Sequence, residues 1–194
     1  RTHHEDIRDA TVEATAKRYH VDSAQAQRVR QLAQLFFSQV DESADNELAF
    51  QRRQKLAWAA RLHEIGIDIA QASFHKHSAY IIANADMPGL SKREQAALAA
   101  LVIPQRGRLA KVAHNLPADD TFAAKVRCLR LAVLLCRSRR NVDARLFSLA
   151  RVNGEYRLSV KADWLQSHSL TEYELRQEID EWKSAGLKLD IVNA

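Results

Sequence analysis

Hydrophobic residues in the first 140 positions recur every three to four residues, a spacing that predicts helices. We expect helices over residues 5–19, 23–40, 48–62, 77–85 and 92–103. Asp22 or Ser23 can cap the second of these, and Ser91 with Glu94 forms a capping-box pattern at the start of the last. The segment 121–139 is apolar on more than one face, which predicts a central, buried helix.

The pattern changes after residue 140. Segments 146–152 and 155–160 flank Asn153-Gly154, a strong signal for a type I′ hairpin. Pairing across this turn places five apolar side chains on one face: Phe147, Leu149, Tyr156, Leu158 and Val160. A second capping box is expected to open another helix, which ends near Gly186 and precedes a short strand. The residues behind this expectation are Thr171 and Glu174 for the box, Leu170 and Leu175 for a hydrophobic staple, and Leu187, Leu189 and Ile191 for the strand.

The predicted fold is therefore mainly α. A helical domain over residues 1–140 is followed by a small α/β C-terminal subdomain over residues 141–194, built from a β-hairpin, a helix and a short strand.

The composition is that of a helix-prone globular protein with a basic excess. The 194 residues are 46% hydrophobic and carry a formal net charge of +5, which favours polyanionic partners. Cys128 and Cys136 are separated by about 12 Å of helical rise and cannot bridge each other, so we expect reduced thiols in the cytoplasm. The sequence shows no membrane span and no signal peptide. Because it begins at Arg1, we expect it to be a piece of a longer protein.

His63 and Glu64 end a predicted helix and precede His75 and His77, an order typical of HD phosphohydrolases. Such enzymes hold a metal with converging His and Asp side chains. In the same pattern the first ligand position is Gln25, the last is Val133, and Glu64 replaces an Asp. Because three of the four positions are altered, we expect a degenerate HD site without a metal. His63 is then a hydrogen-bonded polar residue at a helix end.

Several basic residues are candidates for phosphate contacts, because guanidinium groups bind phosphate oxygens through paired hydrogen bonds. Two of these groups have an alternative, structural role. His75 and His77 could cap the helix that follows them, and the basic residues at 137–140 could compensate the dipole at the C-terminal end of the preceding helix. The predicted polyphosphate-binding residues are His75, His77, Arg106, Arg108, Lys111, Arg137, Arg139 and Arg140. The aromatic residues fall on core faces, so nucleic acid is an unfavourable partner. No nucleophile or phosphate-loop motif is present, and no catalytic residue is predicted in this chain.

Taken together, these runs resemble the C-terminal half of the exopolyphosphatase and guanosine pentaphosphate phosphohydrolase (Ppx/GppA) family. The matching runs are His4-Glu5-Asp6-Ile7-Arg8, Arg18-Tyr19-His20-Val21-Asp22, Trp58-Ala59-Ala60-Arg61-Leu62-His63-Glu64-Ile65-Gly66, His75-Lys76-His77-Ser78-Ala79-Tyr80-Ile81-Ile82, Asp86-Met87-Pro88-Gly89-Leu90 and Leu129-Arg130-Leu131-Ala132. One departure is Val102-Ile103-Pro104-Gln105-Arg106, where many relatives carry a basic, His-containing run.

The resemblance implies an HD-like helical domain that follows an actin-like catalytic module. That module supplies the phosphate loops, a catalytic Glu and a Mg ion, whereas this domain needs no cofactor. The chain would then bind polyphosphate, contribute to a homodimer and be inactive alone, as part of an exopolyphosphatase.

The resemblance and the residues leave alternatives open. The parent could be a guanosine pentaphosphate phosphohydrolase. The chain could also be a stand-alone divergent HD metal phosphohydrolase, or an interaction module for dimerisation or nucleic acid.

Overall fold

The computed structural model describes residues 6–42, 46–117 and 119–194, so His4 and Glu5 of the first matching run lie outside the described residues. The helical part consists of α1 (Ile7–Arg18), α2 (Ser23–Val40), α3 (Asn46–Leu62), α4 (Phe74–Asn84), α5 (Lys92–Val102), the short α6 (Ala110–Ala113) and α7 (Asp120–Leu135). The remaining elements are β1 (Phe147–Val152), β2 (Glu155–Val160), α8 (Ala162–Gln166), α9 (Ser169–Ser184) and β3 (Leu189–Asn193). A mainly α fold with a small α/β tail is therefore confirmed.

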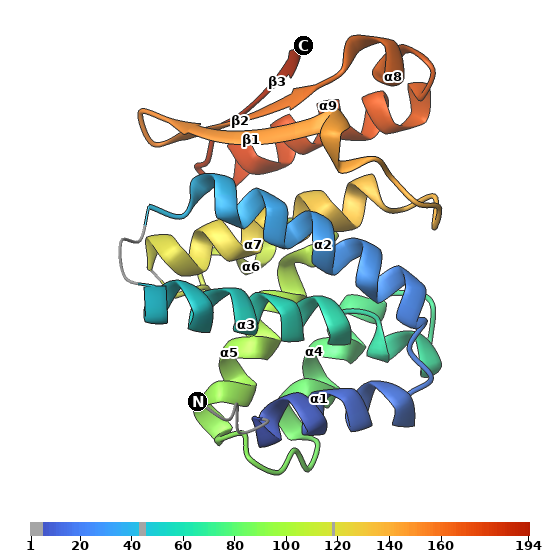
Figure 1. Cartoon of the computed structure of the whole chain (residues 1–194), viewed down its shortest axis with the longest axis vertical. Helices are drawn as coiled ribbons and strands as arrows, with labels where there is room; N and C mark the ends of the chain where they lie inside the picture. Colours follow the sequence, from blue (N-terminus) through green and yellow to red (C-terminus); the bar gives the residue numbers. More distant parts are fainter. Residues whose placement is uncertain (1–5, 43–45, 118) are drawn as a thin grey trace.

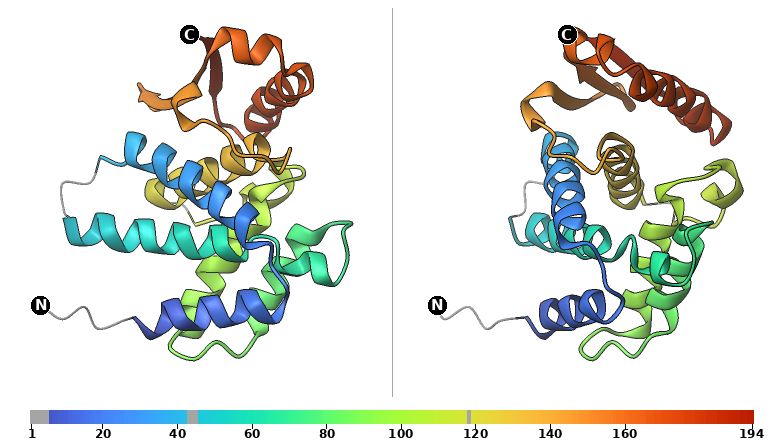
Figure 2. Two further views of the ribbon diagram at one scale, coloured as in Figure 1. Left: turned by 45° about the vertical axis from the view of Figure 1, so that its right-hand side comes forward. Right: turned by 90° about the vertical axis from the view of Figure 1, so that its right-hand side faces the viewer.

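The elements lie in layers along the long axis of the molecule (Figure 1). Helices α1, α4 and α5 form one end, α3 crosses above them, and α2 and α7 lie next. The three-stranded sheet and α9 cover α2 and α7 at the other end, as the turned views in Figure 2 also show. On α7, 12 of 16 residues are buried, which confirms it as the central helix. In the parts of the chain that the structure describes, none of the helices combines the length and apolarity needed to cross a bilayer.

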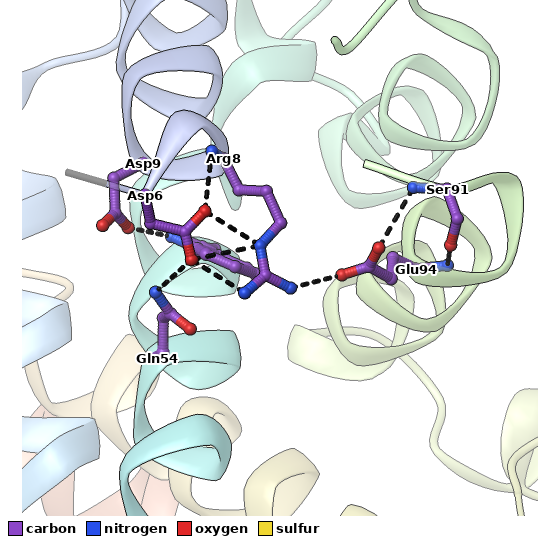
Figure 3. A network of polar contacts seen from close by, with 7 residues as sticks. Asp6, Arg8, Asp9, Gln54, Ser91 and Glu94 are labelled. Carbon is purple, nitrogen blue, oxygen red and sulfur yellow. Dashed lines mark hydrogen bonds and ion pairs between the residues drawn. The ribbon is translucent and has the colours of Figure 1, made fainter. Parts of the chain in front are cut away.

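A polar network holds the start of α1 against α3 and α5 (Figure 3). The Arg8 guanidinium donates to Asp6 and to Glu94, both at 2.7 Å, and Gln54 of α3 donates to Asp6 at 3.1 Å. Ser91 and Glu94 exchange hydrogen bonds at 3.0 and 3.1 Å, which confirms the predicted capping box. The hydrogen bond from Arg8 lowers the pKa of Asp6 to about 2, so this carboxylate stays charged at neutral pH.

The hairpin has the predicted register. Leu149 pairs with Leu158 in the antiparallel ladder, and Asn153 and Gly154 have φ of 52° and 78°, as a type I′ turn requires. The five apolar side chains of the predicted inner face are all buried: Phe147, Leu149, Tyr156, Leu158 and Val160. The last strand, β3, then pairs with β2 in parallel, after the chain has crossed over through α8 and α9.

Three predicted helix boundaries are wrong. Helix α4 begins at Phe74 instead of residue 77, and tertiary contacts decide the other two. Helix α7 ends at Leu135 instead of residue 139, and Arg139 has the left-handed φ of 58°. Helix α9 begins at Ser169, where the ring of His168 stacks on Trp164 at 4.2 Å between centroids. The predicted second box and staple do not form. Leu170 is 68% exposed, and Glu174 pairs with Arg137 instead of capping the helix.

Candidate functional site

A cavity of about 300 Å³ opens where the ends of α2, α3 and α7 meet. All four positions of the HD pattern line it: Gln25, His63, Glu64 and Val133. The other lining residues are Phe74, Arg106, Arg137 and Arg139. We call this space the arginine cavity. Residues that are 108 positions apart in the sequence, Gln25 and Val133, thus reach one place in the fold.

Gln25 lies in the first turn of α2, which Asp22 caps through the backbone N–H of Gln25 at 3.1 Å. The Gln25 side chain is buried and its amide donates to the carbonyl of Cys136 at 2.8 Å. That carbonyl lies at the C-terminal end of α7, where the last carbonyls of a helix lack partners within it. The amide therefore joins two helix ends, in the position where an HD enzyme has a histidine ligand.

His63 follows the last residue of α3 and is 1% exposed. Its Nδ1 lies 2.5 Å from the carbonyl oxygen of Ala60, and its own carbonyl accepts from the Gln105 amide at 2.7 Å. Burial lowers the pKa of His63 below its usual value, so the ring is neutral at pH 7. His63 is thus hydrogen-bonded at a helix end, as predicted.

Glu64 is a buried carboxylate whose partner is the side chain of Arg139. The guanidinium donates to both Glu64 oxygens at 2.8 and 3.2 Å, and to Asp22 at 3.0 Å. The left-handed backbone of Arg139 turns the chain after α7 toward the cavity. Hydrogen bonding to Glu64 raises the pKa of Arg139 above its usual value. The charge of Glu64 is therefore compensated by a cation that the chain itself carries.

These residues do not fit a metal of the HD kind. The described residues contain no cluster of three or more His, Cys, Asp or Glu side chains that could hold a metal ion. At the four positions of the HD pattern, the groups that could bind a metal are one imidazole, one carboxylate already paired with Arg139 and one amide engaged with a carbonyl. The fourth position, Val133, has no ligating atom. An ion that needs three or four converging ligands finds too few of them here.

The cavity instead gathers guanidinium groups. Arg106 lies over the ring of Phe74, with its Cζ 4.8 Å from the ring centroid, and forms no hydrogen bond or ion pair within the described ranges. Arg137 is half exposed and pairs with Glu174, and Arg139 pairs with Glu64 and Asp22. Since Arg106 keeps all its donors for a ligand, the arrangement suits an anion with several oxygens, such as a phosphate.

The structure does not bring the other predicted site residues into the arginine cavity. His75, His77, Arg108, Lys111 and Arg140 are absent from its lining. Both histidines lie inside α4, whose N-cap residue is Ser73. His75 and His77 therefore do not cap this helix, and Ser73 makes no side-chain cap either. Helix α7 has no basic residue in its last turn, so the alternative of dipole compensation by residues 137–140 does not hold either.

His75 lies close to the cavity without lining it. Burial, together with the nearby charge of Arg106, lowers the pKa of His75 to about 4. Its Nδ1 is buried and has no hydrogen-bond partner in the described part of the chain. The ring is therefore neutral at pH 7, and it supplies no charge for a phosphate contact.

Sequence reasoning missed two buried arginines of α7, Arg127 and Arg130. Both stand in α7, a helix with 12 of its 16 residues buried, three residues apart and therefore on one face. Arg130 forms a buried ion pair with Glu178 of α9 at 2.7 Å, whereas Arg127 has no such partner among the described residues. The sequence does contain a signal for them, because two permanently charged residues stand within an otherwise apolar helical pattern.

The comparisons with known proteins agree with this fold. Residues 7–179 match the family described as Ppx/GppA phosphatase, domain III. A guanosine-5'-triphosphate,3'-diphosphate pyrophosphatase of Pseudoalteromonas translucida is 38% identical over 98% of the chain, and those of Aeromonas hydrophila and Vibrio cholerae are each 32% identical over 97% and 96%. In each case the match covers 38% of the relative, so the chain spans about two fifths of the length of these proteins.

Proposed function

Because the chain belongs to the Ppx/GppA phosphatase family and matches its domain III, we propose that it is a non-catalytic, phosphate-binding domain of a phosphohydrolase. The proposed substrate of the whole protein is guanosine 5'-triphosphate,3'-diphosphate, the nucleotide in the names of its relatives. The sequence alone favoured inorganic polyphosphate as the substrate, with guanosine pentaphosphate as the alternative. The names of the relatives favour the nucleotide instead.

The arginine cavity carries the proposal. It combines the guanidinium of Arg106, which has no ion-pair partner among the described residues, with those of Arg137 and Arg139. Its donor set does not fit a metal, so the chain's own residues point to holding an anion rather than to hydrolysing one. We place the chemistry, with its Mg ion, in a catalytic module outside this chain.

Inorganic polyphosphate is the second candidate ligand. Arg108 and Lys111 follow Arg106 in the sequence, are exposed, and form no ion pair within the described residues. If these cations lie along one surface with Arg106, they would contact successive phosphates of a long chain. Each contact releases counterions, so binding would weaken steeply as salt rises.

Calorimetric titration of the chain tests both ligands. The titrants are guanosine 5'-triphosphate,3'-diphosphate, GTP, and short and long polyphosphate, each at about 50 and about 200 mM salt. We expect the pentaphosphate nucleotide to bind more tightly than GTP, and Arg106→Gln to weaken binding about tenfold. Arg145→Gln is the matched control, because Arg145 is 91% exposed and does not line the cavity.

The outcomes separate the alternatives. Equal binding by Arg106→Gln and the unaltered chain would overturn the cavity as the phosphate site. Binding that tightens with polyphosphate length, with no preference for the guanosine nucleotide, would favour the second ligand. Stoichiometric metal in protein purified without chelators would contradict the non-catalytic role. We separately propose that the chain forms a homodimer. Sedimentation equilibrium, which measures its molecular mass in solution, tests this.

A further inference from the structure

A second cavity lies between α7, α6 and the C-terminal end of α9. It has a volume of about 350 Å³ and mostly apolar walls, including those formed by Leu109, Ala113, Ala123, Val126, Trp182 and Leu187. Figure 2 shows α9 of the α/β tail lying above α7 of the helical body. Because residues of both helices line the cavity, it lies at the junction of the two. Ligand pockets of proteins are typically of this size and character, with a few polar groups on apolar walls.

Three titratable or charged side chains line this cavity, those of His114, Arg127 and Arg130. Among the described residues, the one of these three that is buried without an ion-pair partner is Arg127. The residue is only 9% exposed, and its Cζ lies 4.4 Å from the ring centroid of Tyr156 and 5.7 Å from that of Trp182. Its Nε is buried without a hydrogen-bond partner, and no carboxylate of the described residues pairs with it. A guanidinium is always charged at physiological pH, so this one is a buried cation that the protein leaves uncompensated.

Arg130 shows that the helix can satisfy a buried arginine where the role is structural. Its guanidinium donates to both oxygens of Glu178 and to the carbonyls of Pro104 and Gly107, at 2.7 to 3.0 Å. The carboxylates near this cavity are also engaged, since Glu178 serves Arg130 and Glu181 accepts from the backbone N–H of Leu109 at 2.6 Å. Neither of these two carboxylates is therefore free to pair with Arg127.

We propose that this cavity binds a small organic anion, with its carboxylate or phosphate on Arg127 and a ring against the apolar walls. The rings of Tyr156 and Trp182 contact the guanidinium through cation–π interactions, and none of its donors has a hydrogen-bond partner among the described residues. The anion supplies the missing charge, and the apolar walls exclude water from the pair, which strengthens it. This site is separate from the arginine cavity and does not depend on the proposed function.

Binding at this place would have a mechanical consequence. The ligand would contact α7 and the end of α9 together and would stabilise the docking of the tail on the helical body. A ligand that binds only the folded chain raises its apparent stability by mass action.

Titrations of the ¹⁵N-labelled chain followed by NMR test the proposal. The probes are 1-naphthoate, 1-naphthyl phosphate and the uncharged 1-naphthylmethanol. We expect the two anions to shift the amide signals of Leu109, Ala123 and Leu187 and to bind at least tenfold more tightly than the alcohol. Arg127→Met keeps the length and apolar stem of the side chain, and it should abolish this difference between anions and alcohol.

Two further variants keep the test decisive. Ala123→Leu fills the cavity while it retains Arg127, so it should weaken all three probes, which covers the case in which Arg127→Met fails to fold. Arg145→Met removes an exposed cation that lines neither cavity and should leave the affinities unchanged. Equal binding of the alcohol and the anions to the unaltered chain would overturn the role of Arg127. Shifts confined to the arginine cavity would overturn the site itself.

Discussion

The buried ion pair between Arg130 and Glu178 joins the helical body to the tail, and replacing its members tests how much it contributes. Both side chains are 6% exposed. In Glu178→Leu the Arg130 charge stays buried without a carboxylate, and the Trp182 indole loses its 3.2 Å acceptor. Loss of one member of a buried pair typically costs about 3–5 kcal/mol. We therefore expect the free energy of unfolding to fall by about 4 kcal/mol in Glu178→Leu and by a similar amount in Arg130→Met.

The double variant is the informative one. With both charges gone no ion remains unpaired, and only the carbonyls of Pro104 and Gly107 and the Trp182 indole lose partners. At about 1 kcal/mol for each of these three neutral groups left without a partner, we expect a total cost near ~3 kcal/mol, far below the sum of the single variants.

Urea unfolding followed by circular dichroism measures these differences, provided that the m-value stays constant. Arg176→Met is the matched control, because Arg176 pairs with Glu172 on the exposed face of the same helix and should contribute less than 1 kcal/mol. The reasoning is refuted if the single variants at the buried pair cost no more than this control, or if their effects simply add.

Three further predictions concern single residues. Burial lowers the pKa of Lys125 to about 8, so we expect Lys125→Met to be about 2 kcal/mol more stable than the unaltered chain at pH 7. This advantage should shrink between pH 8 and 10.5, where the unfolded chain still binds the Lys125 proton that the folded chain has lost. Burial raises the pKa of Cys128 and Cys136, which lowers stability over the same window in both chains alike, so the measurement is the difference between the two chains. In Gly66→Ala the new Cβ would lie 2.3 Å from the carbonyl oxygen of Phe74, so thermal unfolding should show a loss of about 2 kcal/mol or more. Ser91→Ala removes the cap of α5 and should cost about 1 kcal/mol in the same assay, and no change would show that the capping box is dispensable.

The parts of the fold that the sequence predicts well are those that local chemistry decides. The hairpin register follows from Asn153-Gly154 and from alternation on either side, and both signals lie within a few residues of the turn. The Ser91 box also forms as expected, because its two partners are three residues apart. In contrast, Thr171 and Glu174 have the same spacing, but Glu174 pairs with Arg137, which is 37 residues away.

The candidate site is only half predictable for the same reason. The HD pattern identifies Gln25, His63, Glu64 and Val133 as neighbours, and the fold does place them around one cavity. The compensating Arg139 could not be assigned to Glu64 from sequence, because it depends on α7 ending at Leu135 and on a left-handed residue beyond that end. Ion pairs between residues so far apart in the sequence become visible only in the folded structure.

The Arg130 ion pair also affects how the chain is made. A ribosome completes α7 well before it completes α9, so during synthesis Arg130 lacks the carboxylate that it has in the finished fold. A nascent or prematurely terminated chain without α9 would have to bury a charge or keep the face of α7 that carries it open to solvent. We expect such chains to be recognised by chaperones and proteases, because the charge of Arg130 opposes closure of the core until the tail is present.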